Sequence, residues 1–235
     1  MTDAHDPGVD LLANALRPVI NIMARHKWMG LENIPASGPA IVCPNHLSHV
    51  DPILIGHYLY NSGRLPYFLA KSSLFKFRPA GWALTRGGQI PVLRDTRDAS
   101  KALTFARQAI AEGKLVVIYP EGTLTRDPEL WPMRGRTGAA RLALETGAPV
   151  IPMAHWGIQK VLAPYSKAPK IFPRRQFTVT AGKPVDLSAY ADRSLDGGTL
   201  REATSTIQDA TVELLAKLRG ETPPERRFVY RGAKP

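Results

Sequence analysis

His46 and Asp51 stand five residues apart, just after a short apolar run at residues 40–43 that predicts a buried strand. An imidazole at such a place can take a proton from an alcohol, while a carboxylate holds the ring in the useful tautomer and stabilises the imidazolium. On a regular helix five residues turn the chain by about 500°, which leaves the two side chains roughly 140° apart. The dyad therefore requires a non-helical chain between them. Asp51-Pro52 meets that condition, because the pair is typical of a helix N-cap followed by proline at the first helical position.

Two other interpretations of this segment stay open from the spacing alone. Asp51 can serve only as a helix cap, with His46 a polar loop residue. His46, His49 and Asp51 can also be metal ligands. The sequence offers no cysteine cluster and no further histidine at ligand spacing to complete such a site, so no metal is expected.

Three further segments follow in an order that a single site requires. Residues 87–94, Gly-Gly-Gln-Ile-Pro-Val-Leu-Arg, combine a glycine turn and an apolar stretch with Arg94 at the end. Residues 116–123, Val-Val-Ile-Tyr-Pro-Glu-Gly-Thr, form an apolar strand that is stopped by proline, Glu121 and glycine. Residues 148–152, Ala-Pro-Val-Ile-Pro, predict one more short apolar strand.

The spacing of apolar residues predicts alternating strands and helices along the chain. We expect strands at 40–43, 67–70, 89–93, 115–119, 149–153 and 176–181, and helices at 10–26, 52–60, 99–112, 137–146 and 199–219. This alternation is typical of an α/β fold with a largely parallel, mixed sheet that is flanked by helices. In such sheets ligands bind beyond the carboxyl ends of the strands. His46 and Glu121 both follow a predicted strand, so both stand where that rule places a site.

Together the four segments, His-x4-Asp, Gly-x-Ile-Pro-Val-x-Arg, Pro-Glu-Gly-Thr and Val-Ile-Pro, closely resemble the glycerolipid acyltransferase family of the 1-acylglycerol-3-phosphate O-acyltransferase type. The resemblance covers about residues 30–185. It implies transfer of a fatty acyl group from a thioester, carried by coenzyme A or by acyl carrier protein, to the free hydroxyl of 1-acylglycerol-3-phosphate. The product would be phosphatidate, and no further cofactor is expected.

The resemblance also implies a role for each matching residue. His46 becomes the general base and Asp51 orients it, so that the acceptor alkoxide attacks the thioester directly. No acyl-enzyme intermediate is then required, which agrees with the lack of a Gly-x-Ser-x-Gly elbow in the sequence. The residues assigned to the acceptor and its phosphate are Arg94, Glu121, Gly122 and Thr123.

After Thr123 the chain departs from the family pattern. The family has arginine and then serine at the next positions, whereas this chain has Leu124, Thr125 and Arg126. The phosphate site can therefore use Arg126 or Arg136 instead, or the acceptor can differ. Lys71 also stands where the family has a lysine before its second motif.

Charge and composition point to anionic partners. The net charge is +11, from 31 Lys plus Arg against 20 Asp plus Glu. Such an excess favours a membrane surface, phosphorylated substrates, an acidic carrier protein or nucleic acid, while a solvated basic surface without a partner stays open. We expect a lysophospholipid and an anionic membrane, and no nucleic acid. The single Cys43 lies in an apolar strand, which excludes a disulfide framework and predicts a core residue.

The ends of the chain suggest attachment to a membrane surface. No segment reaches the 18 or so apolar residues of a membrane span, and the N-terminus lacks signal-peptide features. Residues 9–28 predict an amphipathic helix, kinked at Pro18, that either docks on the core or lies in a bilayer interface. We expect a membrane-associating segment at 1–30, the acyltransferase domain at 31–220 and an extended basic tail at 221–235. The predicted location is peripheral and monotopic, on the cytoplasmic face of the cell membrane.

Other functions remain open at the level of sequence. The same chemistry would serve glycerol-3-phosphate or another lysolipid as acceptor. A hydrolase could use His46 and Asp51 on a thioester, with water in place of the acceptor. A basic protein that binds nucleic acid or anionic lipid without catalysis would leave the order of the four motifs unexplained.

Overall fold

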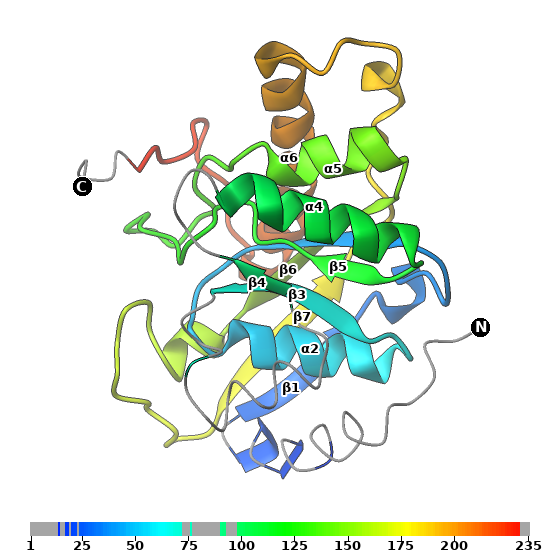
Figure 1. Cartoon of the computed structure of the whole chain (residues 1–235). Helices are drawn as coiled ribbons and strands as arrows, with labels where there is room; N and C mark the ends of the chain where they lie inside the picture. The colour runs from blue at the N-terminus through cyan, green and yellow to red at the C-terminus, as the bar shows by residue number, and fades with distance from the viewer. Residues whose placement is uncertain are drawn as a thin grey trace.

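The computed structural model describes residues 24–71, 90–92 and 98–230, together with residues 14, 17, 18, 20–22 and 76. These residues form three layers, with a central sheet between helix α2 on one face and helices α4, α5 and α6 on the other (Figure 1). The helices are α2 (Asp51–Asn61), α4 (Asp98–Ala111), α5 (Gly138–Thr146) and α6 (Gly197–Arg219). The strands are β1 (Ala24–Met29), β2 (Ala40–Pro44), β3 (Pro66–Lys71), β4 (Ile90–Val92), β5 (Leu115–Val117), β6 (Val150–Trp156) and β7 (Arg175–Ala181).

The seven strands lie in the order β1-β7-β6-β2-β5-β3-β4. All neighbours are parallel except β6 and β7, which are antiparallel. The predicted α/β fold with a largely parallel, mixed sheet is therefore confirmed. All six predicted strands are present, and four of the five predicted helices begin and end within two residues of their expected bounds.

The prediction of a helix over residues 10–26 is wrong at its end. Residues 20–22 are helical, but Ala24–Met29 forms β1, which pairs with β7 along its whole length. Trp28 packs edge-on against Tyr58 and Phe177, and so joins the core between the sheet and α2. Gly30 ends the strand at a φ of +69°, where a Cβ atom would stand 2.1 Å from the carbonyl oxygen of Ala181. The domain boundary expected at residue 30 would therefore separate β1 from the sheet to which it belongs.

The core has two halves, one on each face of the sheet. On β2, Val42 faces the half beneath α2, while Ile41 and Cys43 face the half beneath α4, α5 and α6. A strand that is buried on both faces reads as a continuous apolar run, as this one does. Burial raises the pKa of the Cys43 thiol to about 12. Cys43 is therefore a core residue, as predicted, and not a nucleophile.

At the amino ends of the central strands, a buried arginine joins several segments. Arg64 is only 1% exposed. Its guanidinium donates hydrogen bonds to the carbonyl oxygens of Pro35, Gly38 and Gly113, at 2.6, 2.7 and 3.3 Å. These carbonyls lie in the connection before β2 and in the turn between α4 and β5, so one side chain fixes two loops that are distant in sequence.

The tail has no regular structure over residues 221–230 but lies along α6. Arg227 forms an ion pair with Asp209 and a hydrogen bond with Ser205, both on α6. The carbonyl of Phe228 accepts a hydrogen bond of 3.0 Å from the backbone N–H of Arg134. The described part of the tail is thus held to the domain by these contacts.

Candidate active site

The loop that follows β2 carries the predicted dyad, and its path brings the two side chains together. Asp51 is the first residue of α2 and Val50 is the N-cap, so the prediction of Asp51 as the cap is wrong by one residue. Its carboxylate turns back over the loop instead. Oδ2 of Asp51 accepts hydrogen bonds from the backbone N–H groups of Leu47, at 2.6 Å, and Ser48, at 2.8 Å. The same oxygen lies 2.9 Å from Nδ1 of His46.

The charge of Asp51 fixes the protonation of His46. Burial acts to raise the pKa of the Asp51 carboxyl, but His155 and His46 hold this pKa well below its usual range. An ionised carboxylate can only accept hydrogen bonds, so Nδ1 of His46 carries the hydrogen that lies between them. Nε2 of His46 is then left with a lone pair that can accept a proton from a hydroxyl group.

Aromatic rings set the plane of the His46 imidazole. Tyr119 stacks on it with centroids 4.1 Å apart and planes 22° apart. The ring of Phe68 also stacks on Tyr119, with centroids 6.5 Å apart and planes 17° apart. Burial, and then the negative charge of Asp51, raise the pKa of the Tyr119 hydroxyl well above its usual value. Tyr119 therefore stays neutral and acts as a flat support for the ring.

A second histidine, absent from the sequence prediction, also reaches the carboxylate. His155 on β6 is buried, and its Nε2 lies 3.3 Å from Oδ2 of Asp51 and 2.9 Å from the carbonyl oxygen of Asn45. Both neighbours are acceptors, so Nε2 carries the hydrogen. The Asn45 amide in turn donates to the carbonyl of His155 at 3.1 Å and accepts from its N–H at 2.9 Å. The only signal in the sequence was a histidine in an apolar strand directly after the fourth motif.

Glu121 holds the backbone of His46. This residue is 5% exposed, with Oε1 accepting from the N–H of His46 at 3.2 Å and Oε2 accepting from the N–H of Met133 at 2.9 Å. Burial raises the pKa of Glu121 to about 8, against the opposing effect of these two N–H groups. The N–H of Thr125 donates to the carbonyl of His46 at 2.8 Å, so the loop after β5 fixes His46 from both sides.

The remaining part of the third motif lies beside Arg136. Gly122 has a φ of +69°, and a Cβ atom there would stand 3.3 Å from Nε of Arg136. The backbone N–H of Arg136 donates to the carbonyl of Pro120 at 2.8 Å. The structure thus brings Glu121, Gly122 and Arg136 to one place, with Thr123 half-buried next along the chain.

Arg126 occupies a different environment. Its guanidinium lies over the ring of Tyr165, at 4.6 Å, and over the ring of Tyr230, at 4.4 Å. The side chain is exposed. Leu124, where the family has arginine, is buried. A guanidinium held by its faces keeps N–H groups at its edges that can meet an anion.

Two predicted residues cannot be placed at the site. Lys71 is the last residue of β3 and pairs with Val92 of β4, but its side chain is not among the described ones. Arg94 lies outside the described residues. Their assignment to the acceptor stays a prediction.

The metal interpretation finds no support where the structure can test it. Within the described ranges no group of three or more His, Cys, Asp or Glu residues could hold a metal ion. His49 is exposed, and its ring lies 6.4 Å from that of Tyr165.

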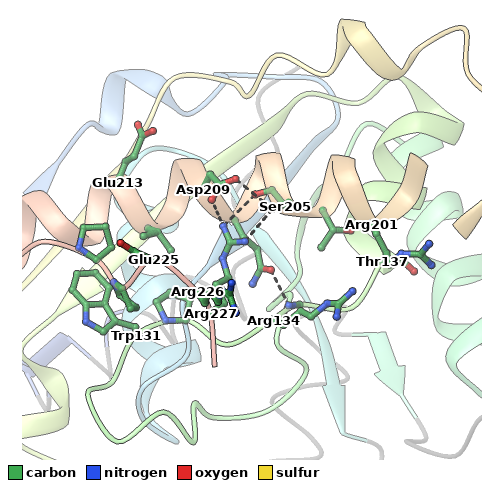
Figure 2. A pocket seen from close by; sticks show the side chains of 17 residues that line it. Trp131, Arg134, Thr137, Arg201, Ser205, Asp209, Glu213, Glu225, Arg226 and Arg227 are labelled. Atoms are coloured by element: carbon green, nitrogen blue, oxygen red, sulfur yellow. Dashed lines mark hydrogen bonds and ion pairs between the residues drawn. The ribbon is translucent and has the colours of Figure 1, made fainter. Parts of the chain in front are cut away.

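A cavity of about 590 Å³ lies between α6, the tail and the loop at residues 131–137 (Figure 2). Met133 of this loop binds Glu121. The lining of the cavity includes neither His46 nor Asp51. Gln208 in its wall donates to the carbonyl of Met133 and accepts from the N–H of Gly135, both at 2.8 Å. Helix α6 therefore braces the loop that in turn binds Glu121.

The fold and the dyad define an α/β protein in which a histidine bound to a buried carboxylate follows the carboxyl end of a central strand. The chain belongs to the acyltransferase family, whose sequence model matches residues 25–156.

Individual relatives agree with this assignment. A chloroplastic 1-acyl-sn-glycerol-3-phosphate acyltransferase of Brassica napus is 33% identical over 135 residues, which cover 57% of this chain and 38% of that protein. The 1-acyl-sn-glycerol-3-phosphate acyltransferase of Chlamydomonas reinhardtii is 29% identical over 180 residues, or 75% and 52% of the two chains. The chain thus spans about half the length of these relatives, or less. The crystal structure of the 1-acyl-sn-glycerophosphate acyltransferase PlsC from Thermotoga maritima shares the fold, with a TM-score of 0.65 at 22% identity, covering 88% of this chain and 78% of that one.

Proposed function

We propose that this protein transfers a fatty acyl group from an acyl thioester to the free hydroxyl of 1-acylglycerol-3-phosphate, forming phosphatidate for phospholipid synthesis. The observation that carries the proposal is the ionised, buried Asp51 bound to Nδ1 of His46, which leaves Nε2 as a base. The names of the relatives support this acceptor.

In the reaction, Nε2 of His46 takes the proton from the acceptor hydroxyl as its oxygen attacks the thioester carbonyl carbon. The new C–O bond forms, the tetrahedral intermediate collapses and the C–S bond breaks. The leaving thiolate takes the proton from the His46 imidazolium, which restores the neutral base. Asp51 remains ionised throughout and stabilises the imidazolium, a role that geometry and charge both support. A thioester is activated enough for this direct attack without an acyl-enzyme intermediate.

For the acceptor phosphate we propose Arg94, with Arg126, Arg136 and Lys71 as further cations. A guanidinium can meet two phosphate oxygens with parallel hydrogen bonds, which supports arginine in this role. A buried leucine, Leu124, stands where the family has arginine. Glycerol-3-phosphate or another lysolipid therefore remains the second candidate acceptor. Glu121, Gly122 and Thr123 shape the loop beside Arg136.

We also propose that the donor is acyl-coenzyme A or acyl carrier protein and that the enzyme works on the cytoplasmic face of a membrane. The net charge of +11 supports binding to an anionic bilayer, aided by residues 1–30. Among the described residues, no helix has the length and apolar character needed to cross a bilayer.

Release of free thiol from an acyl thioester tests the proposal and separates the alternatives. We expect release that depends on 1-acylglycerol-3-phosphate and yields phosphatidate, with glycerol-3-phosphate and other lysolipids as parallel acceptors. Release without any acceptor would indicate a hydrolase, and no release would indicate a binding protein. Arg94→Lys should raise the KM for the acceptor more than the KM for the thioester, and an equal rise would refute its phosphate role.

A further inference from the structure

The loop between the short 3₁₀ helix η3 (Ile158–Lys160) and β7 presents an apolar side chain to solvent. Phe172 is 79% exposed, the highest value among the exposed large apolar side chains of the described residues. The loop is held just before Phe172, since the N–H of Lys170 donates to the carbonyl of Val161 at 2.7 Å and Ile171 packs on the core. Phe172 is therefore displayed by a fixed backbone.

A second exposed apolar side chain comes from a distant part of the sequence, in the segment before β1. Ile22, just before β1, is 65% exposed. Ala24 pairs in parallel with Arg175, and Arg174 donates a hydrogen bond of 3.4 Å to the carbonyl of Ala24. Ile22 and Phe172 thus stand two and three residues before the first partners of the β1–β7 pair, Ala24 and Arg175. In Figure 1 this loop projects at the lower left, next to β1.

Exposed cations lie in the same two segments of the chain as these apolar residues. We define the loop face as the apolar residues Ile22 and Phe172 with the exposed basic residues Arg25, Lys27, Lys167, Lys170 and Arg174. The sequence holds no acid anywhere from residue 157 to residue 185. Exposed apolar side chains with exposed cations close to them in the chain are complementary to a bilayer with anionic headgroups, where the ring of Phe172 would meet the acyl chains and the cations would meet phosphates.

The same loop also reaches the candidate active site. Its Tyr165 donates a hydrogen bond of 2.8 Å to the carbonyl of Leu124, two residues before Arg126. The Tyr165 ring lies near His49, three residues after the base. One continuous loop thus links the catalytic loops to the loop face.

We propose that the loop face binds the headgroup layer of an anionic lipid bilayer and so fixes the entrance of the site against the membrane. The inference rests on the proposed function in that the acceptor, with one acyl chain, is a membrane lipid. It adds a docking surface within the folded domain, in which only Ile22, Arg25 and Lys27 come from the N-terminal segment.

Binding of the full chain to vesicles tests the proposal, with equal parts phosphatidylcholine and phosphatidylglycerol compared with phosphatidylcholine alone. Phe172→Ala should weaken binding to the anionic vesicles about tenfold, because a large ring no longer leaves water. The triple variant Lys167→Gln, Lys170→Gln, Arg174→Gln should weaken it by about 10²-fold and reduce its salt dependence.

Matched controls come from the opposite side of the sheet. Phe105→Ala removes a ring that is 49% exposed on α4, and Arg201→Gln, Lys217→Gln, Arg226→Gln removes the same charge from exposed sites on α6 and the tail. Both controls should bind vesicles almost as the parent does. Equal losses in the controls and the loop variants, or unchanged binding of Phe172→Ala, would overturn the proposal.

Turnover with the acceptor dispersed in detergent separates this proposal from the proposed function. The loop variants should keep parental turnover there and lose it only on vesicles. If the parent protein binds vesicles through the loop face but forms no phosphatidate, the proposed function is refuted and the proposed docking surface stands. If the loop variants keep parental turnover on anionic vesicles, the proposed docking surface is refuted and the proposed function stands.

Discussion

The dyad and the loop face are built in opposite ways. At the dyad, polar atoms are buried and meet at 2.6–3.3 Å, with one carboxylate oxygen receiving the hydrogens of several neighbours. At the loop face, apolar and cationic side chains stand in solvent. The dyad is assembled largely from one short stretch of sequence. The loop face exists only because β1 pairs with β7, about 150 residues later. The spacing of residues in one short segment was therefore enough to predict the dyad. A surface formed by two distant segments can be recognised only when the fold is known.

Removal of the base is the sharpest test of the buried region. His46→Ala should lower turnover by about 10²- to 10⁴-fold, because it removes the group that we propose takes the hydroxyl proton. The melting temperature should change little. His49→Ala is the matched control and should be nearly silent, since His49 is exposed and outside the dyad. A comparable loss in both variants would contradict the assignment of the base.

Asp51→Asn should have the next largest effect, a loss of turnover of about 10²-fold, because the neutral amide no longer fixes the tautomer of His46 or stabilises its imidazolium. The variant also has a signature in stability. The folded-state pKa of Asp51 lies below its unfolded value of 3.8, so its contribution is present above that pH and is lost as the pH falls. The melting temperature of Asp51→Asn should therefore change less with pH across the acid range than that of the parent protein. An unchanged acid dependence would mean that Asp51 is not the buried anion described.

His155 offers a comparison of two substitutions at one buried position. His155→Gln can retain an N–H donor toward Asp51, while His155→Phe cannot, so turnover should fall about tenfold further in the Phe variant. The loss should appear in kcat rather than in the KM of either substrate, because the donor acts on Asp51 and not on a bound substrate. A rise in KM alone would contradict a positioning role. Equal kinetics for the Gln and Phe variants would also exclude a positioning role.

Glu121→Gln should give the smallest effect on turnover and a clear one on stability. The pKa of Glu121 rises from 4.5 to about 8 on folding, so the folded state holds this proton more tightly. Stability should then fall as the pH rises from 4.5 to about 8, because the folded state binds more protons than the unfolded state. The Gln variant should lose that slope in thermal melts. The same slope in both proteins would show that Glu121 does not titrate in this range.

Much of the site follows from sequence, for a physical reason. His46, Asp51 and Glu121 follow strands whose carboxyl ends meet at one edge, so short motifs were enough to predict their assembly. His155 was missed because it reaches Asp51 only through the neighbouring position of β6 and β2, which no local pattern encodes. The strand β1 was missed because residues 24 and 28 fit a helical period as well as a strand period. Pairing with β7 decides between the two. Arg94 lies outside the described residues, so its role remains a prediction.

The buried Arg64 has a consequence for the lifetime of the folded state. Its guanidinium can leave water only when the carbonyls of Pro35, Gly38 and Gly113 are already in place. Its hydrogen bonds therefore belong to the last stage of folding, after the barrier, and must break early in unfolding. Interactions of that kind slow unfolding and leave the folding rate almost unchanged. We expect Arg64→Met to accelerate unfolding in denaturant far more than it slows refolding, as stopped-flow kinetics would measure. A mainly slower refolding would instead place Arg64 in the folding nucleus.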